Sequence, residues 1–537
     1  MKAFFISGFN CVIVIALFLQ ACGPSTEDHA SSVSTSFGKV SGLNEDSVFS
    51  FKGIPYARAE RFMPPQDPDR WEGVRQCVAF GPVAKQVVPW IADSLMNEKE
   101  LFSVNVWTRG LADGKKRPVM LWLHGGGFHV GSSSDPMTDG KALAKKGDVV
   151  VVSVNHRLNI LGFLDLSGVD TKYAQSANVG MLDVVKALEW VRDNIKNFGG
   201  DPSNVTIFGE SGGGGKVGTL MCMPSAKGLF HKAIIQSGTL INVMTKEKSQ
   251  ALGLAVLNNL GLSTNDVHKL DMLSYHTLLK AGNEAIELIN GRRIPGSPTM
   301  FGFAPSADGT VLLQQPFTPG FASISGEIPV LIGTTLNELI RTSYGERDLT
   351  SEQAKDRLRK IYNNRTDRFV KLFAQAYPDF TPQDLLSIDT IFRPFTIRTA
   401  DSWSAQSNAP VYSYFLSWKS PVDSSSRGSF HGLDVPLAFD NVDLRSDWTG
   451  TTSESYDIAD KMSSAWLNFA KTGNPNVVGK LPEWPPYTAS NGSTMSRKCR
   501  YLLRSTQVSP GPSSCVVRRC SRQRKKHLQN RQTLTMM

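Results

Sequence analysis

Residues 205–213 read Val205-Thr206-Ile207-Phe208-Gly209-Glu210-Ser211-Gly212-Gly213, and they carry the strongest indication of the fold. The apolar half of this stretch predicts a strand, and the residues that follow have the spacing of a helix. Glycines two residues before and after Ser211 leave room for a sharp turn with a strained serine. A lone G-x-S-x-G is a weak signal, but in this context it predicts a serine exposed at the edge of a sheet.

Other apolar runs extend this strand into a sheet. They are short and almost unbroken, and they cover residues 119–123, 149–154, 205–208, 233–236, 329–332 and 411–416. Runs of this kind are typical of strands buried on both faces. Stretches with helical spacing lie between them, for example residues 181–191. The alternation predicts an α/β fold with a mostly parallel central sheet flanked by helices.

Residues 245–318 interrupt this alternation, because they read mainly as helix. Insertions after a sheet strand commonly cover active sites, so we expect this helical insertion to form a wall of a substrate pocket. Plain helical packing is the alternative. No segment of twenty to fifty residues recurs, which excludes a solenoid or a propeller.

A glycine-rich run follows the predicted strand 119–123 directly, and it reads His124-Gly125-Gly126-Gly127-Phe128. Glycine lets backbone amides turn inward and lets a substrate carbonyl approach them closely. The amides of Gly125 or Gly126, together with that of Gly212, are therefore expected to form an oxyanion hole. A tight turn at the end of a strand is the alternative, but it leaves the pairing with the Ser211 turn unexplained.

A serine hydroxyl needs a histidine to take its proton, and this chain order places that histidine after the serine. The candidates are His231, His268, His276, His431 and His527. The first lies too close to the serine turn, the next two lie in the helical insertion, and the last lies in a basic tail. Elimination leaves His431, in a loop after the last apolar strand, although a single histidine is more often structural than catalytic.

The ordered motifs resemble those of type-B carboxylesterases, the family that includes the cholinesterases, over residues 51–487. Besides the two runs quoted above, the matching segments are Gly53-Ile54-Pro55-Tyr56-Ala57, Arg61-Phe62, Asn105-Val106-Trp107, Asn155-His156-Arg157-Leu158, Phe198-Gly199-Gly200-Asp201-Pro202 and Gly228-Leu229-Phe230-His231. The resemblance implies an α/β-hydrolase fold and a serine carboxylic ester hydrolase. It also implies a small-molecule ester substrate and no cofactor.

The same resemblance assigns roles to individual residues. The family's acid is a glutamate in a Gly-x-x-x-Asn-Glu segment, which here is Gly333-Thr334-Thr335-Leu336-Asn337-Glu338. Glu338 thus corresponds to the acid, His431 to the general base, and Gly125, Gly126 and Gly212 to the oxyanion donors. Gly212 departs from the family's usual alanine, which is harmless if only its backbone amide is used.

The N-terminal residues 1–21 have the charge, apolar run and small-residue exit of a secretory signal. Leu19-Gln20-Ala21-Cys22 resembles the lipobox of bacterial lipoproteins, in which Cys22 would carry the lipid. An ordinary cleaved signal with an incidental cysteine is the alternative, and either predicts an exported protein. A polar tether over residues 22–36 and a catalytic domain over 37–495 are expected to follow. The seven cysteines form no C-x-x-C pair, so neither a metal site nor a disulfide framework is indicated.

The net charge of +10 is concentrated at the C-terminal end. Residues 497–537 hold eleven Lys and Arg and no acid, so residues 1–496 carry a net charge of −1. We expect residues 496–537 to be a disordered basic tail, with an interaction arm as the alternative. Nucleic acid is not expected as a partner, and a membrane is expected only through Cys22. Two rival functions are a catalytically dead binding protein and a nucleic-acid or membrane-surface binder acting through the tail.

Overall fold

The computed structural model describes most of the chain. The described residues are 31–239, 242–290, 302–317, 320–339, 349–377, 380–387, 389, 391–425, 427–496, 500–503 and 518–519. The predicted signal segment and Cys22 therefore lie outside the described residues. Within the described residues, we find no helix that combines the length and the apolar character needed to cross a membrane.

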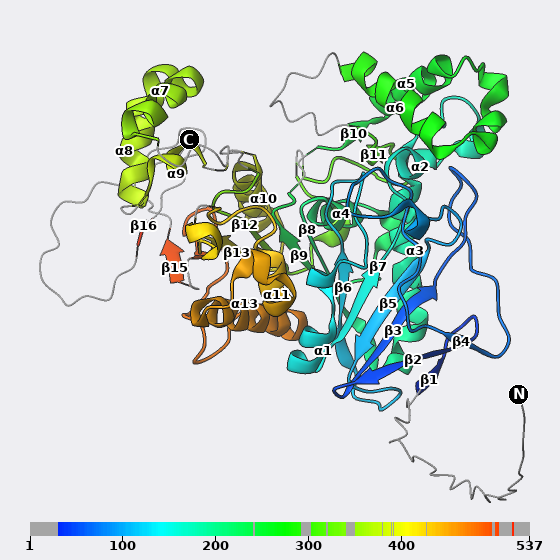
Figure 1. Ribbon diagram of the computed structural model, residues 1–537, viewed down its shortest axis with the longest axis horizontal. Helices are drawn as coiled ribbons and strands as arrows, with labels where there is room; N and C mark the ends of the chain where they lie inside the picture. Colours follow the sequence, from blue (N-terminus) through cyan, green and yellow to red (C-terminus); the bar gives the residue numbers. More distant parts are fainter. Residues whose placement is uncertain are drawn as a thin grey trace, which may run out of the picture.

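One long sheet organises the fold (Figure 1). Its strand order among the described residues is β1 (Ser31–Ser34), β2 (Lys39–Glu45), β3 (Val48–Pro55), β5 (Ser103–Thr108), β7 (Val150–Val154), β6 (Arg117–Leu123), β8 (Gly200–Glu210), β9 (Lys232–Gln236), β12 (Val330–Thr335), β13 (Val411–Leu416), β14 (Thr494–Ser496), β15 (Arg500–Leu503) and β16 (Arg518–Arg519), with β4 (Val74–Gln76) beside β2. The block from β7 through β14 is parallel. The other pairings along this order are antiparallel, and β4 pairs with β2 in parallel. The predicted strands and the parallel core are confirmed.

Successive side chains of the central strands enter two different hydrophobic cores. On β6, Val119, Leu121 and Leu123 pack into one core, whereas Met120 and Trp122 pack into the other. A strand directs alternate side chains to opposite faces, so a strand covered on both sides must be apolar throughout. The helices α3 (Val179–Asn194) and α4 (Gly212–Leu220) cover the first face, and α1 (Lys141–Gly147), α11 (Asp434–Ala438) and α13 (Ser453–Thr472) cover the second (Figure 1).

Two helical groups extend beyond the sheet (Figure 1). The predicted insertion contains α5 (Lys246–Asn259) and α6 (Tyr275–Asn290), which pack on each other near α2 (Asn159–Phe163), and its short β11 (Ser306–Ala307) pairs with β10 (Met244–Thr245). The second group was not predicted as a unit. It lies between β12 and β13 in the sequence and contains α7 (Ser351–Tyr362), α8 (Thr366–Ala376) and α9 (Pro382–Leu386) around a small core of its own, followed by α10 (Phe392–Gln406).

The two ends of the described fold reach into segments that were expected to be irregular. Strand β1 lies within the expected tether 22–36, where Val33 is buried and pairs with Val40 on β2. Strands β15 and β16 lie within the expected tail 496–537 and continue the sheet beyond β14. The rest of that tail, apart from Ser496, lies outside the described residues.

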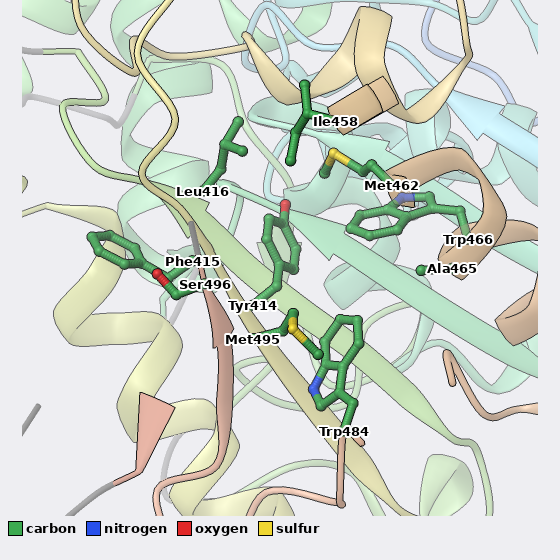
Figure 2. Close-up of a pocket in the computed structure, with 10 residues that line it drawn as sticks. All are labelled: Tyr414, Phe415, Leu416, Ile458, Met462, Ala465, Trp466, Trp484, Met495 and Ser496. Atoms are coloured by element: carbon green, nitrogen blue, oxygen red, sulfur yellow. The ribbon is translucent and has the colours of Figure 1, made fainter. Parts of the chain in front are cut away.

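A cavity lies in the core between β13, β14 and α13 (Figure 2). It is lined by Tyr414, Phe415, Leu416, Ile458, Met462, Ala465, Trp466, Trp484, Met495 and Ser496. No candidate site residue is among these lining residues. The cavity is therefore a feature of the core and not the place where substrate would meet Ser211.

Candidate active site

The candidate residues follow four strands of the parallel block. Gly125 follows β6, Ser211 follows β8, Glu338 follows β12 and His431 lies in a loop after β13. The carboxyl ends of parallel strands meet at one edge of a sheet, where α/β proteins usually bind their ligands. The topology therefore brings these distant residues to a common edge.

Ser211 occupies the sharp turn that the sequence predicts. Its backbone has a φ of 55° and a ψ of −124°, a conformation that costs a non-glycine residue about 1 to 3 kcal/mol. Neighbouring backbone groups hold the turn, since the Ser211 amide donates to the Gln236 carbonyl oxygen at 2.8 Å and the Gly215 amide donates to the Ser211 carbonyl oxygen at 3.0 Å. A Cβ atom on Gly209 would lie 2.5 Å from the carbonyl carbon of Gly213, so this position requires glycine.

The glycine loop after β6 lies directly beside this turn. A Cβ atom on Gly125 would lie 3.5 Å from that of Ser211, and Gly126 and Gly127 have φ values of 85° and 65°. A Cβ atom on Gly212 would lie only 2.1 Å from the Gly127 carbonyl oxygen. Glycine at position 212 is therefore more than a neutral replacement for alanine, because it permits this close approach of the loop.

The three predicted oxyanion donors lie around this contact. Among the described residues, the amides of Gly125, Gly126 and Gly212 donate no hydrogen bond to another backbone group. Gly212 is also the first residue of α4, where helix amides lack intrahelical acceptors and the helix dipole favours negative charge. This arrangement is suited to accept an anionic oxygen.

His431 and Glu338 are brought together as a pair. Their side chains meet at 2.5 Å between Nδ1 and Oε2, and the His431 amide donates to the Glu338 carbonyl oxygen at 3.1 Å. The second carboxylate oxygen of Glu338 accepts a hydrogen bond from the Thr335 amide at 2.8 Å. The His431 ring stacks on Phe392, with centroids 5.0 Å apart and planes inclined by 14°. The imidazole is therefore held from its edge and from its face.

The other ring nitrogen of His431 faces Glu210, the residue before Ser211. Its Nε2 lies 3.2 Å from Glu210 Oε1 and has no hydrogen-bond partner among the described residues. The structure thus places the Nε2 edge of the ring beside Ser211's neighbour, without a hydrogen bond to Ser211 itself. Catalytic hydrogen bonds in free enzymes are often loose and form fully only with substrate bound.

Burial and neighbouring charges govern protonation at this site. Burial raises the pKa of Glu210 above its ordinary range. Burial alone would lower the pKa of His431, but the carboxylates of Glu210, Glu338 and Asp434 outweigh it and raise that pKa above the usual value for histidine. The sequence predicts His431 as the general base, and a general base must be neutral to accept a proton. On that prediction, activity should fall as the pH drops through a value above about 6.5, the usual pKa of histidine.

The Glu210→Gln substitution tests the source of this shift. Removing a negative charge beside Nε2 should lower the pKa of His431 and move the acidic limb of kcat/KM to lower pH by about one unit. The measurement is a pH profile with an uncharged ester, and Glu247→Gln on α5 serves as the control for loss of a remote carboxylate. An unmoved limb would mean that Glu210 is already neutral when His431 titrates.

Sequence reasoning missed two buried ionisable residues of this site. Glu210 was treated only as the variable position of G-x-S-x-G, yet it lies against His431. Lys216 was not considered, although a lone lysine in the run Gly212-Gly213-Gly214-Gly215-Lys216-Val217 is unusual and could have drawn attention. Its ammonium contacts the glycine loop at the carbonyl oxygens of His124 and Gly127.

Known proteins resemble this chain over most of its length. A sequence profile described as "Carboxylesterase family" matches residues 29–501. A para-nitrobenzyl esterase from Bacillus subtilis (strain 168) is 36% identical over 481 residues, which cover 86% of this chain and 94% of that protein.

Solved structures agree with this match. An esterase from Clostridium hathewayi that can hydrolyse aliphatic aromatic polyesters superposes with a TM-score of 0.79 at 35% identity, covering 89% of this chain and 96% of its own. A carboxylesterase from Geobacillus stearothermophilus gives 0.71 at 35% identity, covering 87% and 96%. The chain therefore belongs to the carboxylesterase family and is a serine carboxylic ester hydrolase with an α/β-hydrolase fold.

Proposed function

We propose that Ser211 is the nucleophile of this hydrolase, His431 its general base and Glu338 the acid that orients the base. The observation that carries this assignment is the 2.5 Å contact between His431 Nδ1 and Glu338 Oε2, at the sheet edge where the strained, half-buried Ser211 lies. A base needs a third group that fixes its tautomer and stabilises the imidazolium, and the contact with Glu338 supports this role for its carboxylate.

The amides of Gly125, Gly126 and Gly212 are proposed as the oxyanion hole. Their support is the closeness of the glycine loop to Ser211 and the free helix terminus at Gly212. Each such donor contributes about 3 to 4 kcal/mol to a tetrahedral transition state in other hydrolases.

The reaction then follows from these positions. His431 takes the Ser211 hydroxyl proton while the oxygen attacks the ester carbonyl carbon, and the three amides hold the resulting oxyanion. The imidazolium gives its proton to the leaving alcohol as the C–O bond breaks, which leaves an acyl group on Ser211. Water repeats the sequence from the same side, releases the carboxylic acid and restores the serine hydroxyl.

Covalent labelling separates this proposal from a catalytically dead binding protein. A fluorophosphonate should react once per chain and remain on the peptide that contains Ser211, as detected by mass spectrometry after digestion. Only an activated serine reacts at a useful rate near neutral pH. An unlabelled chain, or a label on another serine, would contradict the assignment.

We also propose that the protein is exported and anchored through lipid on Cys22. The sequence of the signal segment supports this, with the charge at Lys2, the apolar run and the Leu-x-Ala-Cys ending. In bacterial cells that express the full chain, labelled palmitate should enter the protein, and Cys22→Ser should abolish its incorporation. Equal labelling of the two proteins would refute the anchor.

A further inference from the structure

Lys216 is a lysine buried in an unexpected place. It lies in α4, within two turns of Ser211, and its side chain is fully buried. A buried ammonium is costly unless it is well partnered. Packing alone therefore does not account for a lysine at this position.

The partners of Lys216 are backbone carbonyls of the glycine loop. Its Nζ donates to the His124 carbonyl oxygen at 3.0 Å and to the Gly127 carbonyl oxygen at 2.8 Å. The Phe128 ring lies 5.4 Å from Nζ. None of the ion pairs among the described residues involves this ammonium. Lys216 therefore hydrogen-bonds to the glycine loop on both sides of Gly125 and Gly126.

The bond to His124 has an electronic consequence for Gly125. The His124 carbonyl and the Gly125 amide belong to one peptide group, so a donor on the oxygen polarises the N–H and makes it a stronger donor. The next peptide group, which joins the Gly125 carbonyl to the Gly126 amide, is polarised in the same way. Its oxygen lies 2.9 Å from Nδ1 of the His124 ring. Burial lowers the pKa of His124 to about 3, so the ring is neutral and Nδ1 donates.

The contacts do not depend on the charge of Lys216. Burial lowers the pKa of its ammonium to about 7, against the opposing influence of Glu210. A neutral amine still carries two N–H donors, which is enough for the two carbonyl oxygens.

We propose that Lys216 is a positioning residue of the oxyanion hole, which fixes the loop through the His124 and Gly127 carbonyls and aligns and polarises the Gly125 amide. This inference rests on the proposed role of Gly125 as an oxyanion donor. Such a residue acts on the tetrahedral state, whose oxygen is charged, and hardly on the neutral ester.

The test compares Lys216→Met with the wild type and with Lys232→Met. Methionine keeps an apolar stem but donates nothing, and Lys232 is a second buried lysine, at the far end of β9. For each protein we would measure kcat, KM, the acylation burst and inhibition by two compounds of the same skeleton. A trifluoromethyl ketone forms a tetrahedral adduct with serine, and the corresponding secondary alcohol does not.

Lys216→Met should lower kcat and ketone affinity by about ten- to a hundredfold, less than the loss of a whole donor. KM, alcohol affinity and burst stoichiometry should stay close to wild type, and Lys232→Met should change neither kcat nor ketone affinity. If Lys216→Met does not fold, Lys216→Gln replaces it in the same comparison. Because the glutamine amide retains N–H donors, the expected loss of kcat and ketone affinity is then smaller.

Two results would overturn the role of Lys216. One is unchanged kcat and ketone affinity, and the other is an equal loss of ketone and alcohol affinity, which marks general damage to the pocket. Ser211→Ala, measured alongside, separates this inference from the proposed function. Tight ketone binding by Ser211→Ala would refute the assignment of Ser211 as the nucleophile. If Ser211→Ala is inactive but Lys216→Met binds the ketone normally, only the positioning role of Lys216 is refuted.

Discussion

Replacing Ser211 with alanine is expected to reduce ester turnover by about a millionfold, as loss of the nucleophile does in other serine hydrolases. The residual rate comes from binding and from the oxyanion donors, which the substitution leaves in place. The measurement is kcat for an activated ester under conditions in which trace wild-type enzyme is excluded by prior fluorophosphonate treatment. The fold should persist, because alanine retains the Cβ atom and the turn is held by backbone hydrogen bonds.

Ser203→Ala provides the control on the same strand. Ser203 lies toward the opposite end of β8 and is exposed, so its loss should leave turnover within about twofold of wild type. Near-normal turnover of Ser211→Ala would remove the basis of the proposed mechanism.

Replacing His431 with glutamine is expected to lower kcat almost as far, again by about a millionfold, because serine and histidine act as a unit. Glutamine can still hydrogen-bond to Glu338, so the buried carboxylate is not left without a partner. The substitution thus removes the base while limiting damage to the loop. Turnover and the fluorophosphonate labelling rate should fall together.

The matched control is His268→Gln in the helical insertion. His268 is another histidine that follows Ser211 in the sequence, and its side chain is exposed. Its loss should leave turnover and labelling unchanged. If His268→Gln were the inactive variant and His431→Gln the active one, the elimination that selected His431 would be wrong.

Much of the fold could be predicted because the strands are buried on both faces. Residues such as Val119 to Leu123 must all be apolar, and this leaves a plain signal in the sequence. The helical group α7 to α9 gave no comparable signal. It packs around a small separate core that includes Leu358 and Phe373, away from the regular alternation of strands and helices.

The site was predicted unevenly for a similar reason. The pairing of His431 with Glu338, seen at 2.5 Å, came from the family resemblance, because ninety-three residues separate the two in the chain. The closeness of Glu210 to His431 Nε2 depends on how a loop folds back over the serine turn, and no local pattern encodes it. Lys216 did leave a local signal, as a charge in an otherwise glycine-rich and apolar helix.

The common edge of the parallel strands has a consequence for how this enzyme can change. The serine turn, the glycine loop, the proposed acid and the proposed base each follow a separate strand of the parallel block. The loops that follow these strands can lengthen, shorten or be exchanged without moving the ends of the strands. Descendants of this chain could therefore acquire new preferences for acid or alcohol while inheriting the same chemistry, since selectivity and reactivity are carried by different parts of the polypeptide.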